Sequence, residues 1–172
     1  TQNLDYLKDL GIKGIWLMPI NTNQDQDHGY SVADYRNIDP DYGTLTDFDE
    51  LLREAHARDI GIVMDYVINH SSANNAIFLN AASSPDSRYR DWYTWRNQTP
   101  TDWDVWGKNP WKALAWGSYY APFTDIMPDW NLRNPAVVDY HMNNMRFWLN
   151  RGLDGFRFDA VGMLFENGPK AF

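Results

Sequence analysis

The fold of this chain can be read from the stretch Gly155-Phe156-Arg157-Phe158-Asp159-Ala160-Val161, near its C-terminal end. The stretch follows Gly152, a residue typical of a helix end, and it is short, apolar and bounded by turn residues, as buried parallel strands are. Side chains alternate across a strand, so Arg157 and Asp159 share one face and the phenylalanines take the other. Opposite charges on a covered sheet face are costly unless they meet each other, a ligand or water. The pattern therefore predicts a functional site or, as the alternative, a buried structural ion pair.

A second stretch of the same kind lies earlier in the chain, from Ile62 to His70. It is an apolar run that one carboxylate, Asp65, interrupts and that polar residues follow. The carboxyl ends of parallel strands meet at one edge of a sheet, where βα folds place their functional groups. Two strands of this kind favour a shared crevice over a structural ion pair.

Helix and strand patterns alternate in the first part of the chain. Leucines at helical spacing before Gly11 predict a helix, and the run from Gly14 to Met18 predicts a strand that ends at Pro19. We expect a polar loop from Asn21 to Tyr42. The next predicted helix has Thr46 or Asp47 as its cap, Glu50 as capping-box partner, and an apolar face of Phe48, Leu51, Leu52 and Ala55.

The pattern breaks from Ser71 to Arg133, where turn residues recur and seven of the nine Trp residues fall between Trp92 and Trp130. A long segment of this kind is usually functional or forms a small lobe. Most of these Trp side chains are expected to form the core of that lobe. Asn134 and Pro135 then start a helix. Its predicted apolar face holds Val138, Met142, Met145 and Leu149.

The alternation of helices and strands predicts an α/β fold with a parallel sheet. Three strands make an arc, because a closed eight-stranded barrel needs about 250 residues. The expected organisation is a first barrel part over 1–70, an inserted small domain over 71–133 and a continuation of the barrel over 134–172. We expect the chain to be a fragment of a larger enzyme.

Composition excludes several classes of function. A net charge of -8 disfavours nucleic acid as a partner, because phosphate binding needs clustered Lys and Arg. No apolar stretch approaches the roughly 20 residues of a membrane span. The chain has no cysteine, which removes thiol catalysis but leaves its compartment open. Aromatic residues make up 16% of the chain, and their flat faces favour a surface that recognises a neutral ligand.

Five segments together resemble one family. The segments Asp65–His70 and Gly155–Asp159 are similar to two signatures of the α-amylase family of retaining glycoside hydrolases. Three others, His28–Tyr30, Asp39–Thr44 and Met127–Asn131, match further family segments in the family's order. The resemblance implies strands two, three and four of a (β/α)8 TIM barrel, with the family's inserted small domain after the third strand.

The resemblance also implies roles for individual residues. Asp159 matches the family's nucleophile, and the adjacent Arg157 cation favours its ionised form. Asp65 and His70 match residues that hydrogen-bond the sugar at the cleavage site, and Tyr30, with His28 beside it, resembles the platform on which that sugar stacks. For each the alternative is a structural role in a loop or ion pair.

A metal site is a further implication of the resemblance. Asn69 and Asp129 match calcium ligands of some members and are candidate ligands of a structural calcium ion, although the chemistry itself needs no cofactor. The segment Val161–Met163 lacks the Lys-His pair that those members carry. One amide beside one carboxylate is also a thin donor set for Ca²⁺, which takes six or more oxygens.

The family's general acid lies beyond the end of this chain, so the fragment alone is expected to be inactive. We expect the parent to hydrolyse α-1,4-glucans or maltooligosaccharides. The segment from Arg90 to Arg96 resembles oligo-1,6-glucosidases, α-glucosidases and trehalose-forming relatives, which makes an exo-acting or transglycosylating enzyme the close alternative. Two other classes, a catalytically silent scaffold like the transporter heavy subunits that resemble this family and a carbohydrate-binding module, do not require the four polar residues Asp65, His70, Arg157 and Asp159.

Overall fold

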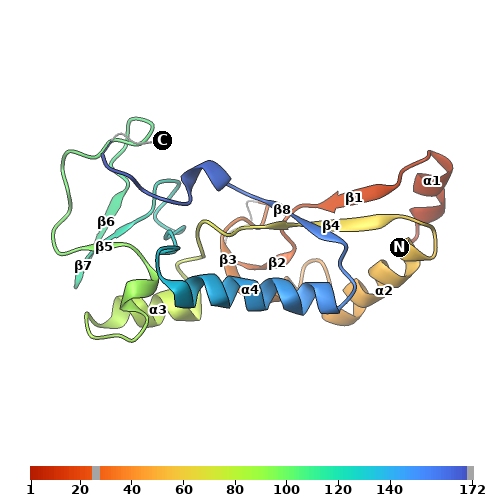
Figure 1. Cartoon of the computed structure of the whole chain (residues 1–172), viewed down its shortest axis with the longest axis horizontal. Helices are drawn as coiled ribbons and strands as arrows, with labels where there is room; N and C mark the ends of the chain where they lie inside the picture. Colours follow the sequence, from red (N-terminus) through yellow and green to blue (C-terminus); the bar gives the residue numbers. More distant parts are fainter. Residues whose placement is uncertain (25–27, 170–172) are drawn as a thin grey trace.

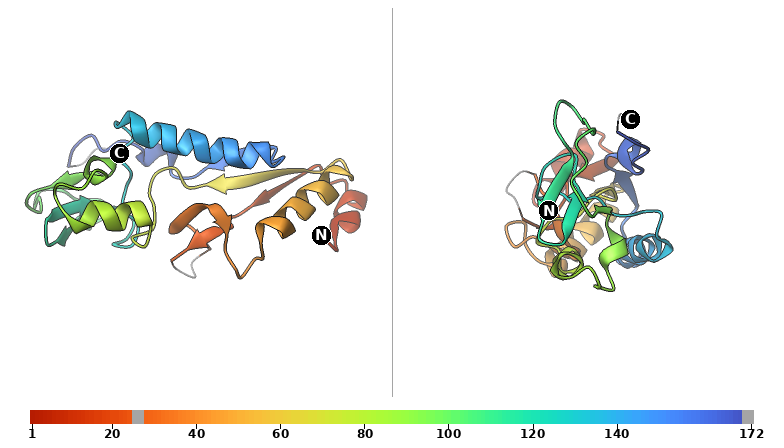
Figure 2. Two further views of the ribbon diagram at one scale, coloured as in Figure 1. Left: turned by 90° about the horizontal axis from the view of Figure 1, so that it is seen from below. Right: turned by 90° about the vertical axis from the view of Figure 1, so that its left-hand side faces the viewer.

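The computed structural model describes residues 1–24 and 28–169. Three parallel strands form its central sheet, β1 (Gly14–Leu17), β4 (Gly61–Tyr66) and β8 (Gly155–Phe158), in the order β1-β4-β8. The helices α2 (Leu45–His56) and α4 (Pro135–Asn150) lie along one side of this sheet, and the short α1 (Leu4–Asp9) lies at its N-terminal end (Figures 1 and 2). The predicted α/β arc of three parallel strands is confirmed.

The opposite side of the sheet is open. Side chains alternate along each strand, and Ile62, Met64 and Tyr66 of β4 are buried toward the helices. Trp16 of β1 points to the other side and is 54% exposed. Asp65 and Arg157 share this open side, because they are paired in register on neighbouring strands.

The helices begin at capping residues. Asn134 caps α4 through its side chain, which accepts a bond from the Ala136 amide, and Pro135 takes the first helical position as predicted. The cap of α2 was predicted wrongly, because Thr44 is the capping residue and Asp47 is its capping-box partner. Thr44 lies outside the apolar periodicity, so that pattern placed the start of the helix too late.

The buried face of α4 also differs from the prediction. Val137, His141, Asn144 and Trp148 are buried, whereas Val138, Met142 and Leu149 of the predicted face are exposed. The polar members of the buried face have side-chain partners, since His141 bonds the Tyr66 hydroxyl and Asn144 accepts a bond from Arg36. Hydrophobic periodicity does not detect a helix face that is buried through polar contacts.

The loop predicted from Asn21 to Tyr42 is wrong as a structural assignment. It contains an antiparallel pair, β2 (Asn21–Asn23) and β3 (Val32–Ile38), although its residues 25–27 lie outside the described residues. Val32, Tyr35 and Ile38 of β3 are buried. Their spacing of three does not follow the two-residue alternation of a strand, because register shifts interrupt the pairing.

Residues 71–133 contain short regular elements that the sequence did not indicate. They are α3 (Ala76–Ser83), a 3-10 turn (Arg90–Trp92) and an antiparallel sheet of order β5-β7-β6, with β5 (Trp95–Arg96), β7 (Gly117–Tyr120) and β6 (Trp111–Leu114). They lie at the end of the molecule opposite α1 (Figure 1). Trp111 and Trp130 are buried, Trp92 and Trp95 pack against the core, and Trp106 and Trp116 are exposed.

In the described part of the chain, no helix combines the length and apolar character that crossing a membrane requires.

Candidate active site

A charged cluster lies at the carboxyl ends of β4 and β8. Arg157 Nη1 donates to Asp159 Oδ1 at 2.6 Å and to the Asp65 carboxylate at 2.9 and 3.1 Å. The contact follows from the strand register, which pairs Asp65 with Arg157, and Asp159 follows two positions later on the same face. One guanidinium therefore binds both carboxylates that the sequence placed in a shared crevice.

The two carboxylates of this cluster differ in exposure. The Asp65 side chain is fully buried, whereas 21% of the Asp159 side chain is exposed. Burial raises the pKa of Asp65, against the lowering effect of its bonds from Arg157 and Tyr30. The bonds to Asp65 and Asp159 raise the pKa of Arg157. Asp65 thus serves Arg157 and Tyr30 as an acceptor, and Asp159 has the more accessible oxygens.

Tyr30 reaches this cluster from the loop before β3. Its hydroxyl donates to Asp65 Oδ2 at 3.1 Å, and burial together with the Asp65 charge raises the pKa of Tyr30 to about 12. Gly29 sets the path of the loop, because it has a φ of +84° and a Cβ atom there would lie 2.5 Å from the Pro19 carbonyl oxygen. Tyr30 is therefore positioned by a close approach of its loop to the end of β1.

His70 lies in the loop that follows β4. Its backbone pairs with Asp129, and the neighbouring bonds run from Ser71 N to Pro128 O and from Trp130 N to Asn69 O, at 3.0 and 2.9 Å. The imidazole is buried, and burial lowers the pKa of His70 to about 4, although the Asp159 charge acts in the opposite direction. The ring is neutral at pH 7, so its nitrogens offer one donor and one acceptor.

Tyr30, His70 and Asp159 border one cavity of about 350 Å³, which Phe123, Thr124 and Met127 also line. Asp159 is the only carboxylate among these described lining residues. Phe123, Thr124 and Met127 come from the segment before Asp129, and the Phe123 ring lies 5.1 Å from the His70 ring. The sequence did not predict the Phe123 contact, because no local pattern marks this position. Its only signal was proximity to the segment Met127–Asn131.

His28 lies elsewhere on the same loop. It is exposed and lines a second, polar cavity of about 550 Å³ together with Asn23, Gln24, Gly29, Asp39, Asp41 and Tyr42. The structure therefore groups Tyr30, His70 and Asp159 around one cavity and places His28 at a different one.

Asn69 and Asp129 lie side by side in the paired segments 69–71 and 128–130. Both are buried, and one side-chain oxygen of each has no hydrogen-bond partner within the described residues. Burial raises the pKa of Asp129. Across residues 1–24 and 28–169, no group of three or more His, Cys, Asp or Glu side chains could hold a metal ion. Two side-chain oxygens do not fit Ca²⁺, which takes six to eight.

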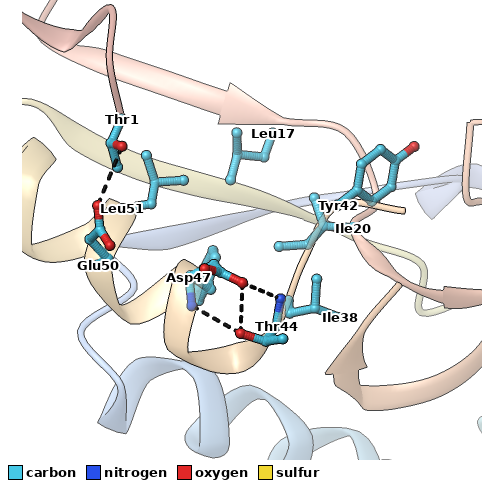
Figure 3. Close-up of a pocket in the computed structure, with 10 residues that line it drawn as sticks. Thr1, Leu17, Ile20, Ile38, Tyr42, Thr44, Asp47, Glu50 and Leu51 are labelled. Carbon is cyan, nitrogen blue, oxygen red and sulfur yellow. Dashed lines mark hydrogen bonds between the residues drawn. The ribbon is translucent and has the colours of Figure 1, made fainter. Parts of the chain in front are cut away.

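A different cavity, of about 290 Å³, lies between β1, β3 and α2 (Figure 3). Leu17, Ile20 and Leu51 line it with the capping pair of Thr44 and Asp47. The capping box of Thr44 and Asp47 at its wall fixes the start of α2. None of the cluster residues is part of it.

Comparison with known proteins relates the chain to one family. Residues 1–171 match the family model of the α-amylase catalytic domain. The chain is 42% identical to α-amylase 3 of Dictyoglomus thermophilum over 167 residues, which are 97% of this chain and 32% of that protein. It is 42% identical to an oligo-1,6-glucosidase of Heyndrickxia coagulans over 170 residues, which are 94% of this chain and 30% of that enzyme.

The fold agrees as well. The crystal structure of trehalose-6-phosphate hydrolase from Bacillus licheniformis matches with a TM-score of 0.91 and 35% sequence identity, over 98% of this chain and 33% of that one. The chain thus spans about a third of the length of the relatives that it matches. A family model that matches nearly every residue, relatives at this level of identity and a shared fold lead to one conclusion: the chain belongs to the α-amylase catalytic domain family.

Proposed function

We propose that this chain is part of a longer glycoside hydrolase that cleaves α-glucosidic bonds in α-1,4-glucans or maltooligosaccharides with retention of configuration. The observation that carries the proposal is the Asp159 carboxylate, which Arg157 binds at 2.6 Å and which borders the cavity with Tyr30 and His70. A neutral, ring-shaped substrate suits a cavity with one carboxylate, one phenol and one uncharged imidazole.

In the proposed reaction Asp159 is the nucleophile. One of its oxygens attacks the anomeric carbon while the glycosidic C–O bond breaks, and the leaving oxygen takes a proton from a general acid. In retaining enzymes the carboxyl groups of nucleophile and acid are about 5 to 5.5 Å apart. Water then cleaves the glycosyl-enzyme ester, and the same acid group acts as base. Arg157 orients the Asp159 carboxylate before the attack, through the bond from its Nη1 atom. The general acid is supplied by sequence outside this chain.

The other residues of the cluster bind and orient. Tyr30 offers its ring to the apolar face of the sugar, and His70 offers neutral nitrogens to its hydroxyl groups. Asp65 holds both Arg157 and the Tyr30 hydroxyl, so it aligns the nucleophile and the stacking residue through one buried carboxylate. His28 remains a candidate substrate-binding residue at the polar cavity.

An exo-acting α-glucosidase, an oligo-1,6-glucosidase or a trehalose-forming transglycosylase is the second candidate. Relatives with the names oligo-1,6-glucosidase, α-glucosidase and trehalose-6-phosphate hydrolase favour it. A silent scaffold is less favoured, since it has no chemical need for an accessible Asp159 beside Arg157.

The test is product analysis of the full-length enzyme on starch, maltose, isomaltose and sucrose, together with the variant Asp159→Asn. We expect α-glucoside cleavage by the wild type, and a kcat lower by several orders of magnitude with oligosaccharide binding retained in the variant. Asp154→Asn is the matched control, because Asp154 also accepts bonds, from His56 and the Ile62 amide, but lies at the opposite end of β8. Normal turnover in Asp159→Asn would exclude it as the nucleophile.

A further inference from the structure

Tyr35 of β3 lies beneath the loop that carries His70 and is 1% exposed. Its hydroxyl bonds two backbone carbonyl oxygens of that loop, those of Val67 at 2.9 Å and His70 at 2.7 Å. The hydroxyl has one proton, so the two carbonyls share it. The indole N–H of Trp130 donates to the same hydroxyl at 3.1 Å. The phenol group is therefore satisfied as donor and acceptor, away from water.

The bonds of Tyr35 complete the support of this loop. Strand pairing of β4 ends at Tyr66, and the following residues are held on one side by the bonds to Pro128 and Trp130. On the other side the Tyr35 hydroxyl satisfies the Val67 and His70 carbonyls, and both residues are buried. A buried carbonyl that loses its donor is costly, so the loop would shift to find another.

The direction of the His70 ring depends on this backbone. Nε2 of His70 has no side-chain hydrogen-bond partner within the described residues, and Nδ1 lies 3.3 Å from the side-chain nitrogen Nδ2 of Asn69. Among the described residues, Asn69 is the one side chain that bonds the ring, and the backbone of Tyr30 also interacts with it. The His70 carbonyl and Cα belong to one rigid backbone unit, so a shift of the carbonyl turns the imidazole relative to the cavity.

Tyr35 itself is held firmly. Its backbone carbonyl accepts the indole N–H of Trp148, from α4, at 2.8 Å. The rings of Tyr66, Trp130, Tyr140 and His141 lie between 5.4 and 6.2 Å from the Tyr35 ring. Tyr35 thus connects β3 with the loop after β4, with the segment before α4 and with α4 itself. Such contacts are the support that a precisely arranged site requires.

We propose that the Tyr35 hydroxyl, fixed by Trp130, positions His70 for the reacting sugar. This inference rests on the proposed function. It makes Tyr35 a positioning residue, because its hydroxyl bonds the Val67 and His70 carbonyls and the Trp130 indole, and Tyr35 is not among the residues that line the cavity.

The test uses Tyr35→Phe in the full-length enzyme, which removes the hydroxyl and keeps the ring. We expect kcat to fall about tenfold with KM changed less than twofold, because a misdirected imidazole loses a bond that strengthens in the transition state. Tyr66→Phe is the matched control. Tyr66 is equally buried in the same aromatic cluster, but its hydroxyl bonds His141 of α4 and not the loop. This control is expected to keep kcat within twofold.

A double-mutant cycle separates positioning from general stability. In the His70→Ala background, Tyr35→Phe should have no further effect on kcat, because Tyr35 acts through His70. An unchanged tenfold loss in that background would overturn the inference. Trp130→Phe keeps a ring but removes the N–H, and is expected to reproduce a weaker form of the Tyr35→Phe effect.

Amide hydrogen exchange gives a readout that does not need a substrate. Tyr35→Phe should speed exchange at residues 67–71 at least tenfold, and Tyr66→Phe should not. Equal exchange in both variants would contradict the inference that the Tyr35 hydroxyl holds this loop. If the wild-type enzyme cleaves no α-glucoside, the proposed function fails, and the exchange experiment still decides whether Tyr35 holds the loop.

Discussion

At the scale of single residues, the guanidinium of Arg157 binds two carboxylates that differ in exposure. Asp65 is buried and holds Arg157 and Tyr30, while Asp159 keeps accessible oxygens at the cavity. The Arg157 guanidinium also lies 5.4 Å from the centre of the Trp16 ring, so an aromatic face limits its movement on the open side.

Replacement of Arg157 by Lys should therefore lower activity, although it keeps the positive charge. The Arg157→Lys variant has a compact ammonium that cannot reproduce the bonds to both Asp65 and Asp159. Because a lost bond to a charged group costs about 1.5–3 kcal/mol, kcat/KM should fall by roughly 10- to 100-fold in steady-state kinetics. Arg58→Lys is the control, since Arg58 also binds two carboxylates, Asp5 and Glu54, far from the cavity. Equal activity of both variants would contradict the role given to Arg157.

At the scale of elements, one glycine in the loop before β3 fixes the position of Tyr30, the residue proposed to stack on the sugar. Gly29 and Gly11 have nearly the same backbone conformation, with φ of +84° and +81°. Only Gly29 is crowded, because a Cβ at Gly11 would meet nothing within 4 Å. The two positions separate the cost of a left-handed backbone from the cost of a collision.

We expect Gly11→Ala to lower the free energy of unfolding by about 1–2 kcal/mol, the cost of an L-residue in the left-handed region, and to leave activity unchanged. Gly29→Ala should cost more and should also raise KM, because relief of the contact with Pro19 moves Tyr30. Urea unfolding and steady-state kinetics measure the two effects. An unchanged KM in Gly29→Ala would show that Tyr30 does not depend on this approach.

At the scale of the whole molecule, two buried histidines link stability to pH. Burial lowers the pKa of His70 to about 4 and that of His141 to about 3, against an unfolded value near 6.5. Below pH 6.5 these two histidines bind protons in the unfolded chain, whereas in the folded chain they stay neutral until the pH approaches 4 and 3. The stabilisation by these groups is therefore complete above about pH 6.5 and is lost as the pH falls toward their folded pKa values.

The urea midpoint should accordingly drop between pH 6.5 and pH 4. In His141→Gln, which cannot titrate but can keep a polar contact with Tyr66, the slope of this drop should be smaller. The measurement is a series of urea titrations at fixed ionic strength. A slope identical to that of the wild type would mean that His141 does not contribute to the drop.

The sequence predicted those features that neighbouring residues decide. Alternation around Arg157 and Asp159, the start of α4 at Asn134 and Pro135 and the run that contains Asp65 are local patterns, and each predicted its element. The motifs were also sufficient to predict the family. Local patterns failed where a residue outside the apolar period caps a helix, as Thr44 does, and where polar groups are buried, as on α4.

Only the tertiary structure decided which of these residues meet. Arg157 and Asp65 are 92 positions apart, and their contact exists because β4 and β8 pair in one particular register. Phe123 reaches His70, and Tyr35 reaches the His70 carbonyl, through contacts that no periodicity in their local sequence predicts. Periodicity reflects neighbours within a few residues along the chain, whereas a site is assembled by packing between elements, which no local pattern encodes.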